Sequence, residues 1–159
     1  MTEPWKTIVA SSLDWDQAHM NFGDVVAELD PSLRNRKPAG LPHSVWDIVE
    51  HIRIAQHDLL EFCRNADYHH DLTWPEDYWP KDAGDISHET WAKSLSEIDR
   101  EMTELKAFTT EDGRDLTAKI PAGTGQTYLR TVLVAMDHTS YHTGEIVMIR
   151  RLLGAWPPA

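Results

Sequence analysis

Residues 44–64 read SVWDIVEHIRIAQHDLLEFCR, and this stretch decides the fold that we predict. Its apolar residues recur at the three- to four-residue spacing of one α-helical face. Ser44 can cap the free amides of the first turn while Asp47 reaches back, which marks the start of the helix. The predicted inward face carries Ile48, His51, Ile52, Ala55, Leu59 and Phe62, and the predicted outward stripe carries Glu50, Arg53, His57, Glu61 and Arg64.

Three further segments have the same period and are separated by helix breakers. The first runs from about Trp5 to Leu29, where Asp30 and Pro31 end it, and the others cover about 87–110 and 127–153. The predicted buried positions of the first segment are Trp5, Ile8, Val9, Ser12, Trp15, His19, Phe22 and Val26. Those of the segment 87–110 are Trp91, Leu95, Ile98, Met102, Leu105 and Phe108.

These four segments predict an all-α protein, a four-helix bundle formed by one domain over residues 1–159. The interval 65–86 is too long for a tight turn, so we expect it to cross over between parallel second and third helices. Gly23 and the Ser11-Ser12 pair can bend the first helix. Trp46, in the second helix, is expected in the core.

The charge balance limits the classes of partner. The chain has 26 acidic and 15 basic residues and a net charge of −11, which repels phosphate backbones and anionic lipids. We therefore expect neither nucleic-acid nor membrane binding. The start Met1-Thr2-Glu3-Pro4 lacks the basic and apolar regions of a secretory signal, and Cys63 has no second cysteine to pair with. Both features favour a cytoplasmic protein.

Nine histidines are many for 159 residues, and three of them point to a metal site. His138 and His142 are the one histidine pair four residues apart, a spacing that stacks both rings on one helical face within reach of one ion. His51 lies among apolar residues on the inward face of its helix, where a buried imidazole needs a partner. A shared metal would supply that partner, whereas the alternative is a hydrogen bond to Asp or Tyr.

The other histidines differ in the helix face or loop that they occupy. We expect His57 to be a solvated surface residue and His19 to be a core residue, with a pocket or the metal as its alternatives. His43 precedes the second helix and is expected at a cavity mouth. His69, His70 and His88 fall in or beside the long loop and are expected to be exposed. Cys63 is predicted to be a packed thiol without nucleophilic character.

Two segments resemble the DinB-like superfamily, also called YfiT-like metalloenzymes. They are LPHSVWDIVEHIR at 41–53 and MDHTSYHTGEI at 136–146, and the resemblance covers essentially the whole chain. The family pattern has an inward His on the second helix and H-x-x-x-H-x-G-Q-I on the last. The resemblance implies up-down-down-up topology, a homodimer, and nickel or zinc held by His51, His138 and His142. Where the family has Gln, this chain has Glu145.

Glu145 lies three residues beyond His142 on the same side of the helix, and its role is open. A carboxylate there can be a fourth ligand, orient a bound water or accept its proton, and equally it can pair with a base such as Arg150. We treat Glu145 as the candidate catalytic residue.

Three protein ligands leave positions on the ion open, as in catalytic metal sites. Relatives of known activity imply a leading function, the activation of a low-molecular-weight thiol for transfer to an electrophile, with a small molecule as substrate. A metal-dependent hydrolase and a non-catalytic metal- or ligand-binding protein are the alternatives.

The loop between the second and third helices is rich in aromatic residues. Tyr68, Trp74, Tyr78 and Trp79 fall within twelve residues, between which Pro75 stiffens the chain. One reading is that these rings wall the metal pocket and bind an apolar substrate. The other, which we prefer slightly on the sequence alone, is that they cover one end of the bundle or a dimer interface.

Overall fold

The computed structural model describes residues 3–81 and 84–157, and it confirms an all-α protein. Within these ranges there are five α-helices and no strand. They are α1 Pro4–Ser12, α2 Phe22–Val26, α3 Val45–Arg64, α4 His88–Thr110 and α5 Tyr128–Leu152, and two 3₁₀ helices, η1 Pro31–Leu33 and η2 Glu76–Tyr78, lie in the connections. Among the described residues, no helix combines the length and apolar character needed to cross a bilayer.

The three long helices start where the sequence predicts, because each has a side-chain cap. In α3 the amide of Asp47 donates to Ser44 Oγ at 3.1 Å and the amide of Ser44 donates to Asp47 Oδ2 at 2.9 Å, which completes the capping box. The side chains of Ser87 and Thr127 cap α4 and α5 by accepting from the amides of Thr90 and Arg130. Beyond α5, Gly154 has a φ of 71°, the left-handed conformation that ends many helices.

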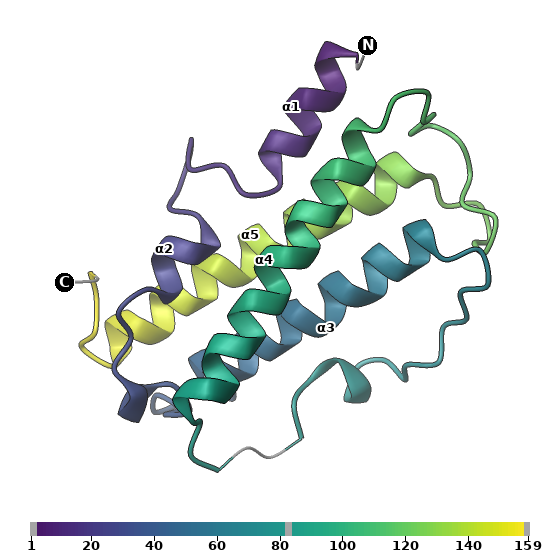
Figure 1. Cartoon of the computed structure of the whole chain (residues 1–159). Coiled ribbons are helices and arrows are strands. Elements are labelled where there is room, and N and C mark those ends of the chain that lie inside the picture. Colours follow the sequence, from purple (N-terminus) through teal and green to yellow (C-terminus); the bar gives the residue numbers. More distant parts are fainter. Residues whose placement is uncertain (1–2, 82–83, 158–159) are drawn as a thin grey trace.

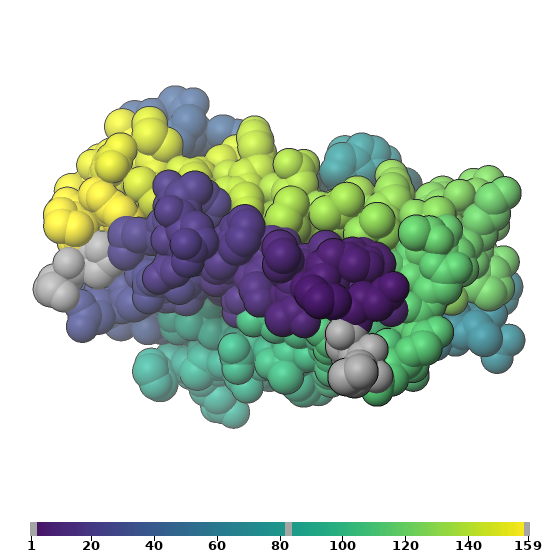
Figure 2. Space-filling model, turned by 90° about the horizontal axis from the view of Figure 1, so that it is seen from above, coloured from purple at the N-terminus to yellow at the C-terminus, as the bar shows by residue number. Residues whose placement is uncertain are grey.

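Helices α3, α4 and α5 form the main body of the molecule (Figure 1), and α3 packs against both of the others. Trp46, Ile52, Trp91, Ile98 and Ile146 are among the buried residues that they contribute to one apolar cluster. Helix α1 contacts α4 and helix α2 contacts α5. In Figure 2 the N-terminal segment lies along the molecule between α5 on one side and α4 on the other.

The predicted first helix over residues 5–29 is wrong, because the segment forms two short helices joined by an irregular linker at 13–21. Its predicted buried face is also wrong in part. Ile8 is 61% exposed, whereas Lys6 is only 4% exposed and donates from Nζ to the carbonyl oxygen of Arg114. Trp15 and His19 lie in the linker and are exposed, so His19 is not a core residue.

Local side-chain hydrogen bonds explain where the helix breaks. Ser12 Oγ donates to the carbonyl of Val9 at 2.7 Å, which competes with continuation of the backbone ladder. Farther along, the side chain of Asn21 accepts from the amide of Asp24 at 2.9 Å and so starts a new helix. The spacing of the apolar residues alone predicts one continuous helix, because it takes no account of these two hydrogen bonds.

The outward stripe of α3 is partly covered by α4. Glu50, predicted at the surface, is 8% exposed. It stays charged because Arg53 donates to it from Nε at 2.9 Å and from a terminal nitrogen at 2.8 Å, and these bonds and the pairing hold the pKa of Glu50 below its usual range against the effect of burial. His57 is exposed, as predicted, and its Nδ1 lies 2.9 Å from Glu101 of α4.

A buried guanidinium joins the end of α5 to α2. Arg150 donates to the carbonyl oxygens of Val25 at 2.7 Å, Ala27 at 2.8 Å and Ala155 at 2.9 Å. Replacing Arg150 by Met leaves buried backbone acceptors without donors, so we expect the free energy of unfolding to fall by about 3 kcal/mol. Urea denaturation measures this loss. The control is Arg151→Met at the adjacent exposed position, and an equally large loss there would contradict the assignment.

Candidate metal centre

The structure brings the three predicted histidines together between α3 and α5. One ring nitrogen of each of His51, His138 and His142 lies within 4.8 Å of the others. The Nε2 atoms of His51 and His138 are 3.0 Å apart. His51 and His142 are buried and His138 is half-buried. Nitrogens about 2.0–2.1 Å from one tetrahedral ion lie about 3.3 Å from one another, so this cluster fits a single divalent ion with small shifts.

Hydrogen bonds to two of the rings determine which nitrogen faces the cluster. His51 Nδ1 lies 2.7 Å from the carbonyl oxygen of Tyr78, which can only accept, so Nδ1 carries the proton and Nε2 has a free lone pair. His142 Nδ1 lies 2.5 Å from the carboxylate of Glu145, which assigns the same tautomer to His142. Both rings therefore offer Nε2 as a metal ligand. Metal-bound histidines usually have this arrangement, in which the other ring nitrogen donates a hydrogen bond to a carboxylate or a carbonyl oxygen.

All three histidines are kept neutral by their surroundings. Burial, followed by the neighbouring His142 and His51, lowers the pKa of His138 to about 3. Burial and the neighbouring histidines lower the pKa of His142 to about 4. Burial also lowers the pKa of His51, against a smaller opposing effect of the Tyr78 carbonyl and Glu145. Unprotonated rings at neutral pH are the form that binds transition metals.

These lowered pKa values predict an acid-sensitive metal-free protein. An unfolded histidine has a pKa of about 6.5, so as the pH falls below that value the unfolded chain binds protons that the folded cluster does not. The free energy of unfolding should therefore fall between pH 6.5 and about pH 4, and it should be independent of these groups above pH 7.5. Urea denaturation in EDTA at pH 7.5 and pH 5 measures the change. A His138→Ala variant should lose less over this interval, and an equal loss would contradict the prediction.

Glu145 orients His142, and the alternative in which Glu145 pairs with Arg150 is wrong. Arg150 is committed to backbone carbonyls near α2, whereas Glu145 Oε2 is hydrogen-bonded to His142 Nδ1. The Glu145 side chain is 36% exposed, so it lies where the cluster meets solvent. Its carboxylate thus acts on a histidine of the cluster, from the side of the His142 ring opposite the nitrogen that faces the other two histidines.

The aromatic loop forms one wall of the histidine cluster. The Trp79 indole stacks on His51 at a centroid distance of 4.0 Å and on His43 at 3.9 Å, with interplanar angles of 4° and 6°. The carbonyl of Tyr78 accepts from His51, as described above. The loop is held in place because the hydroxyls of Tyr68 and Tyr78 each donate to Asp58 of α3 at 2.6 Å. Trp79 thus supports the first reading of the loop, as a wall of the pocket.

The remaining histidines and the cysteine lie outside the cluster. His43 lies next to the cluster, because its ring stacks on the face of Trp79. His69, His70 and His88 are exposed, as predicted. Cys63 is buried, and burial raises the pKa of its thiol to about 12, which confirms a packed and unreactive side chain. Sequence reasoning missed the individual roles of Trp79, Tyr78 and Asp58, for which the aromatic composition of the loop was the available signal.

Comparison with known families agrees with this geometry. A family model described as the DinB superfamily matches residues 14–146, which include all three histidines and Glu145. No curated protein and no solved structure gave a significant match. The family match and the three-histidine cluster together fit a metal-binding protein. The chain belongs to the DinB superfamily.

Proposed function

We propose that the protein is a metal-dependent enzyme that activates a low-molecular-weight thiol for transfer to an electrophile. The observation that supports this is the cluster of three neutral histidines, two with Nε2 lone pairs directed inward by fixed partners. Three nitrogen ligands leave open positions on a divalent ion, nickel or zinc by family resemblance. An ion bound there would lower the pKa of a bound thiol or water toward neutrality.

The residues of the chain supply positioning and a route for the proton. In the transfer, the thiol S–H bond is broken, sulfur forms a bond to the electrophilic carbon, and the leaving group departs with its bonding electrons. Glu145, partly exposed beside His142, can pass the thiol proton to solvent. Trp79 and Tyr141, whose rings contact His51 and His142, border the site with apolar surface that suits an apolar electrophile.

A metal-dependent hydrolase is the second candidate, and the carboxylate of Glu145 beside His142 favours it. Glu145, which is hydrogen-bonded to His142 and partly exposed, can act through an intervening water as the general base for water attacking an ester or lactone. In that reaction the hydroxyl oxygen forms the bond to the carbonyl carbon, and the alcohol leaves with a proton.

One set of assays separates these functions. The protein is loaded with zinc or nickel, its metal content is measured, and product is followed by mass spectrometry for bacillithiol, mycothiol and glutathione against alkyl halides and epoxides. Metal-dependent product that contains the thiol supports the proposal. Ester or lactone cleavage without any thiol supports the hydrolase instead. Stoichiometric metal without either activity would leave a metal-binding protein and overturn the proposal.

We also propose that α1 and α2 together take the place of the first helix in an up-down-down-up four-helix bundle. Their contacts support this, because α1 packs on α4 while α2 packs on α5. A homodimer is proposed as well, supported by the exposed apolar side chains of Tyr141, Met148 and Leu152 on α5. Light scattering should give twice the 18.2 kDa mass of the chain, and a monomer at micromolar concentration would contradict the dimer.

A further inference from the structure

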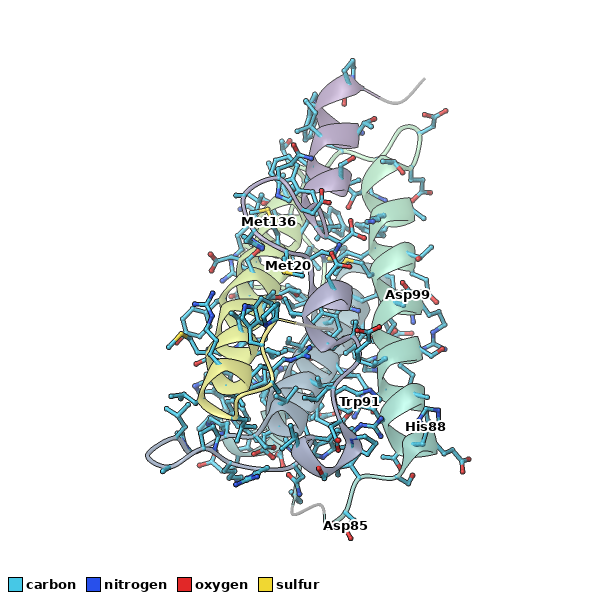
Figure 3. All side chains as sticks on the ribbon, turned by 90° about the vertical axis from the view of Figure 1, so that its left-hand side faces the viewer. Met20, Asp85, His88, Trp91, Asp99 and Met136 are labelled. Atoms are coloured by element: carbon cyan, nitrogen blue, oxygen red, sulfur yellow. The ribbon has the colours of Figure 1, made fainter. Side chains whose placement is uncertain are left out.

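A cavity lies along a different face of α5 from the one that carries His138 and His142. It has a volume of about 350 Å³ and is bounded by the 13–21 linker, α2, α4 and α5. Figure 3 shows the linker, marked by Met20, in front of the space between α4 and α5. The cavity exists because α1 packs on α4 whereas α2 packs on α5, so that the linker between them spans the two long helices.

The walls of this cavity carry apolar and aromatic side chains together with polar ones, which include Ser12, His19, Asn21 and Ser140. Trp15 and Phe22 contribute rings from the N-terminal segment, and Leu95, Ile98 and Met102 contribute aliphatic surface from α4. Its size lies within the usual range for small-molecule sites, about 300–1,000 Å³. Thr139 and Thr143 line it from α5, one residue after His138 and His142, but the histidines themselves do not line it. A ligand here would therefore lie on a different face of α5 from His138 and His142.

The charge of the lining selects the kind of ligand. Asp14 and Asp99 both line the cavity, and no lysine or arginine does. Asp14 is paired with Lys106, which lies outside the lining. The carboxylate of Asp99 is exposed at the edge of the cavity and has no hydrogen-bond or ion-pair partner among residues 3–81 and 84–157, so it is free to pair with the cation of a ligand. The rings of Trp15 and Phe22 also line the cavity, and aromatic rings attract cations to their faces.

We propose that this cavity binds a small hydrophobic amine, with its apolar part between Trp15, Phe22 and the α4 side chains and its ammonium group at Asp99. An anion is disfavoured by the two carboxylates, and a neutral compound would gain no ion pair with Asp99. This site is independent of the proposed metal chemistry, since it shares no lining residue with the three histidines.

The test uses three probes of one shape, 4-phenylbutylamine, 4-phenylbutanol and 4-phenylbutanoate, titrated into the full chain and followed by calorimetry. The amine should bind about fivefold more tightly than the alcohol, because an exposed ion pair and a cation–π contact are each modest. The carboxylate should bind most weakly. Equal affinities for the amine and the alcohol, tighter binding of the carboxylate, or no binding of the amine would each overturn the proposal.

Variants locate the binding. Asp99→Asn should reduce the affinity for the amine to that for the alcohol and leave the alcohol unchanged, while Glu89→Gln on the exposed first turn of α4 should change neither. Ser140→Phe should fill the cavity and abolish binding of both probes; its thermal unfolding reports whether the fold is kept. His138→Ala should bind the amine normally, which separates failure of this proposal from failure of the metal site. An unchanged amine preference in Asp99→Asn would contradict the assignment even if Ser140→Phe does not fold.

Discussion

Replacing His138 or His142 by alanine is expected to abolish stoichiometric binding of zinc or nickel. Each substitution removes one of three nitrogens that lie within 4.8 Å of one another, and two imidazoles do not hold such an ion firmly. Removal of one ligand from three should weaken binding by more than about 100-fold, beyond the 10- to 100-fold typical of outer partners. Metal content after dialysis, measured by mass spectrometry, reports the loss directly.

The matched control is His57→Ala, two turns from His51 on the same helix. His57 is exposed and bonded to Glu101 of α4, so its removal should leave the metal content unchanged. The difference between the two kinds of variant is the helix face, because the side chains are chemically identical. Equal loss of metal from His57→Ala, or full retention in His138→Ala, would show that the ion is bound elsewhere.

The sequence predicts the helices and ligands that rest on local rules. The capping box at Ser44 and Asp47 fixes the start of α3, and so the face on which His51 lies. The four-residue spacing of His138 and His142 then places both rings on one side of α5. These signals act over a few residues, which is why a periodic pattern is sufficient to find them.

The N-terminal segment shows where such reasoning fails. Over residues 5–29 the helical period predicts one helix with a bend at Ser11-Ser12, yet α1 ends at Ser12 and Asn21 caps the start of α2. The burial of Lys6 depends on a carbonyl more than one hundred residues away, at Arg114, and no local pattern carries that information. The break also creates the cavity beneath the linker.

The sequence predicts that aromatic residues of the loop cover some part of the bundle, but it does not predict which of them contact the histidines. An aromatic loop signals that some pocket or surface is covered, but the stacking of Trp79 on His51 depends on how a 23-residue connection, 65–87, folds back. Asp58 fixes that path through two tyrosine hydroxyls, and in sequence it looks like an ordinary polar position near the end of a helix. Contacts of this type, between residues far apart in the sequence, can be identified only from the structure.

Glu145→Ala is expected to weaken metal binding by about 10- to 100-fold, the usual cost of removing an outer partner of a metal-bound histidine. The carboxylate accepts from His142 Nδ1 at 2.5 Å and so holds the tautomer with Nε2 free. Glu145→Gln should cost much less, because the amide oxygen can accept the same hydrogen bond and glutamine is the usual residue of the family. Titration with a competing chelator compares the two variants. Equal losses would show that the charge, and not the hydrogen bond, supports binding.

The same glutamine variant separates the two proposed reactions. In a hydrolase, Glu145 would be the general base, and such assistance is worth about 10²–10⁴-fold in rate. Under the thiol-transfer proposal the nucleophile needs no base once the proton has left, so kcat/KM should fall by less than about tenfold, a barrier change of at most about 1.4 kcal/mol. The comparison is made at equal metal content, so that a loss of bound metal is not mistaken for a loss of catalytic rate. A fall in kcat/KM of more than about 100-fold in Glu145→Gln at full metal content would contradict the expectation for thiol transfer and favour the hydrolase.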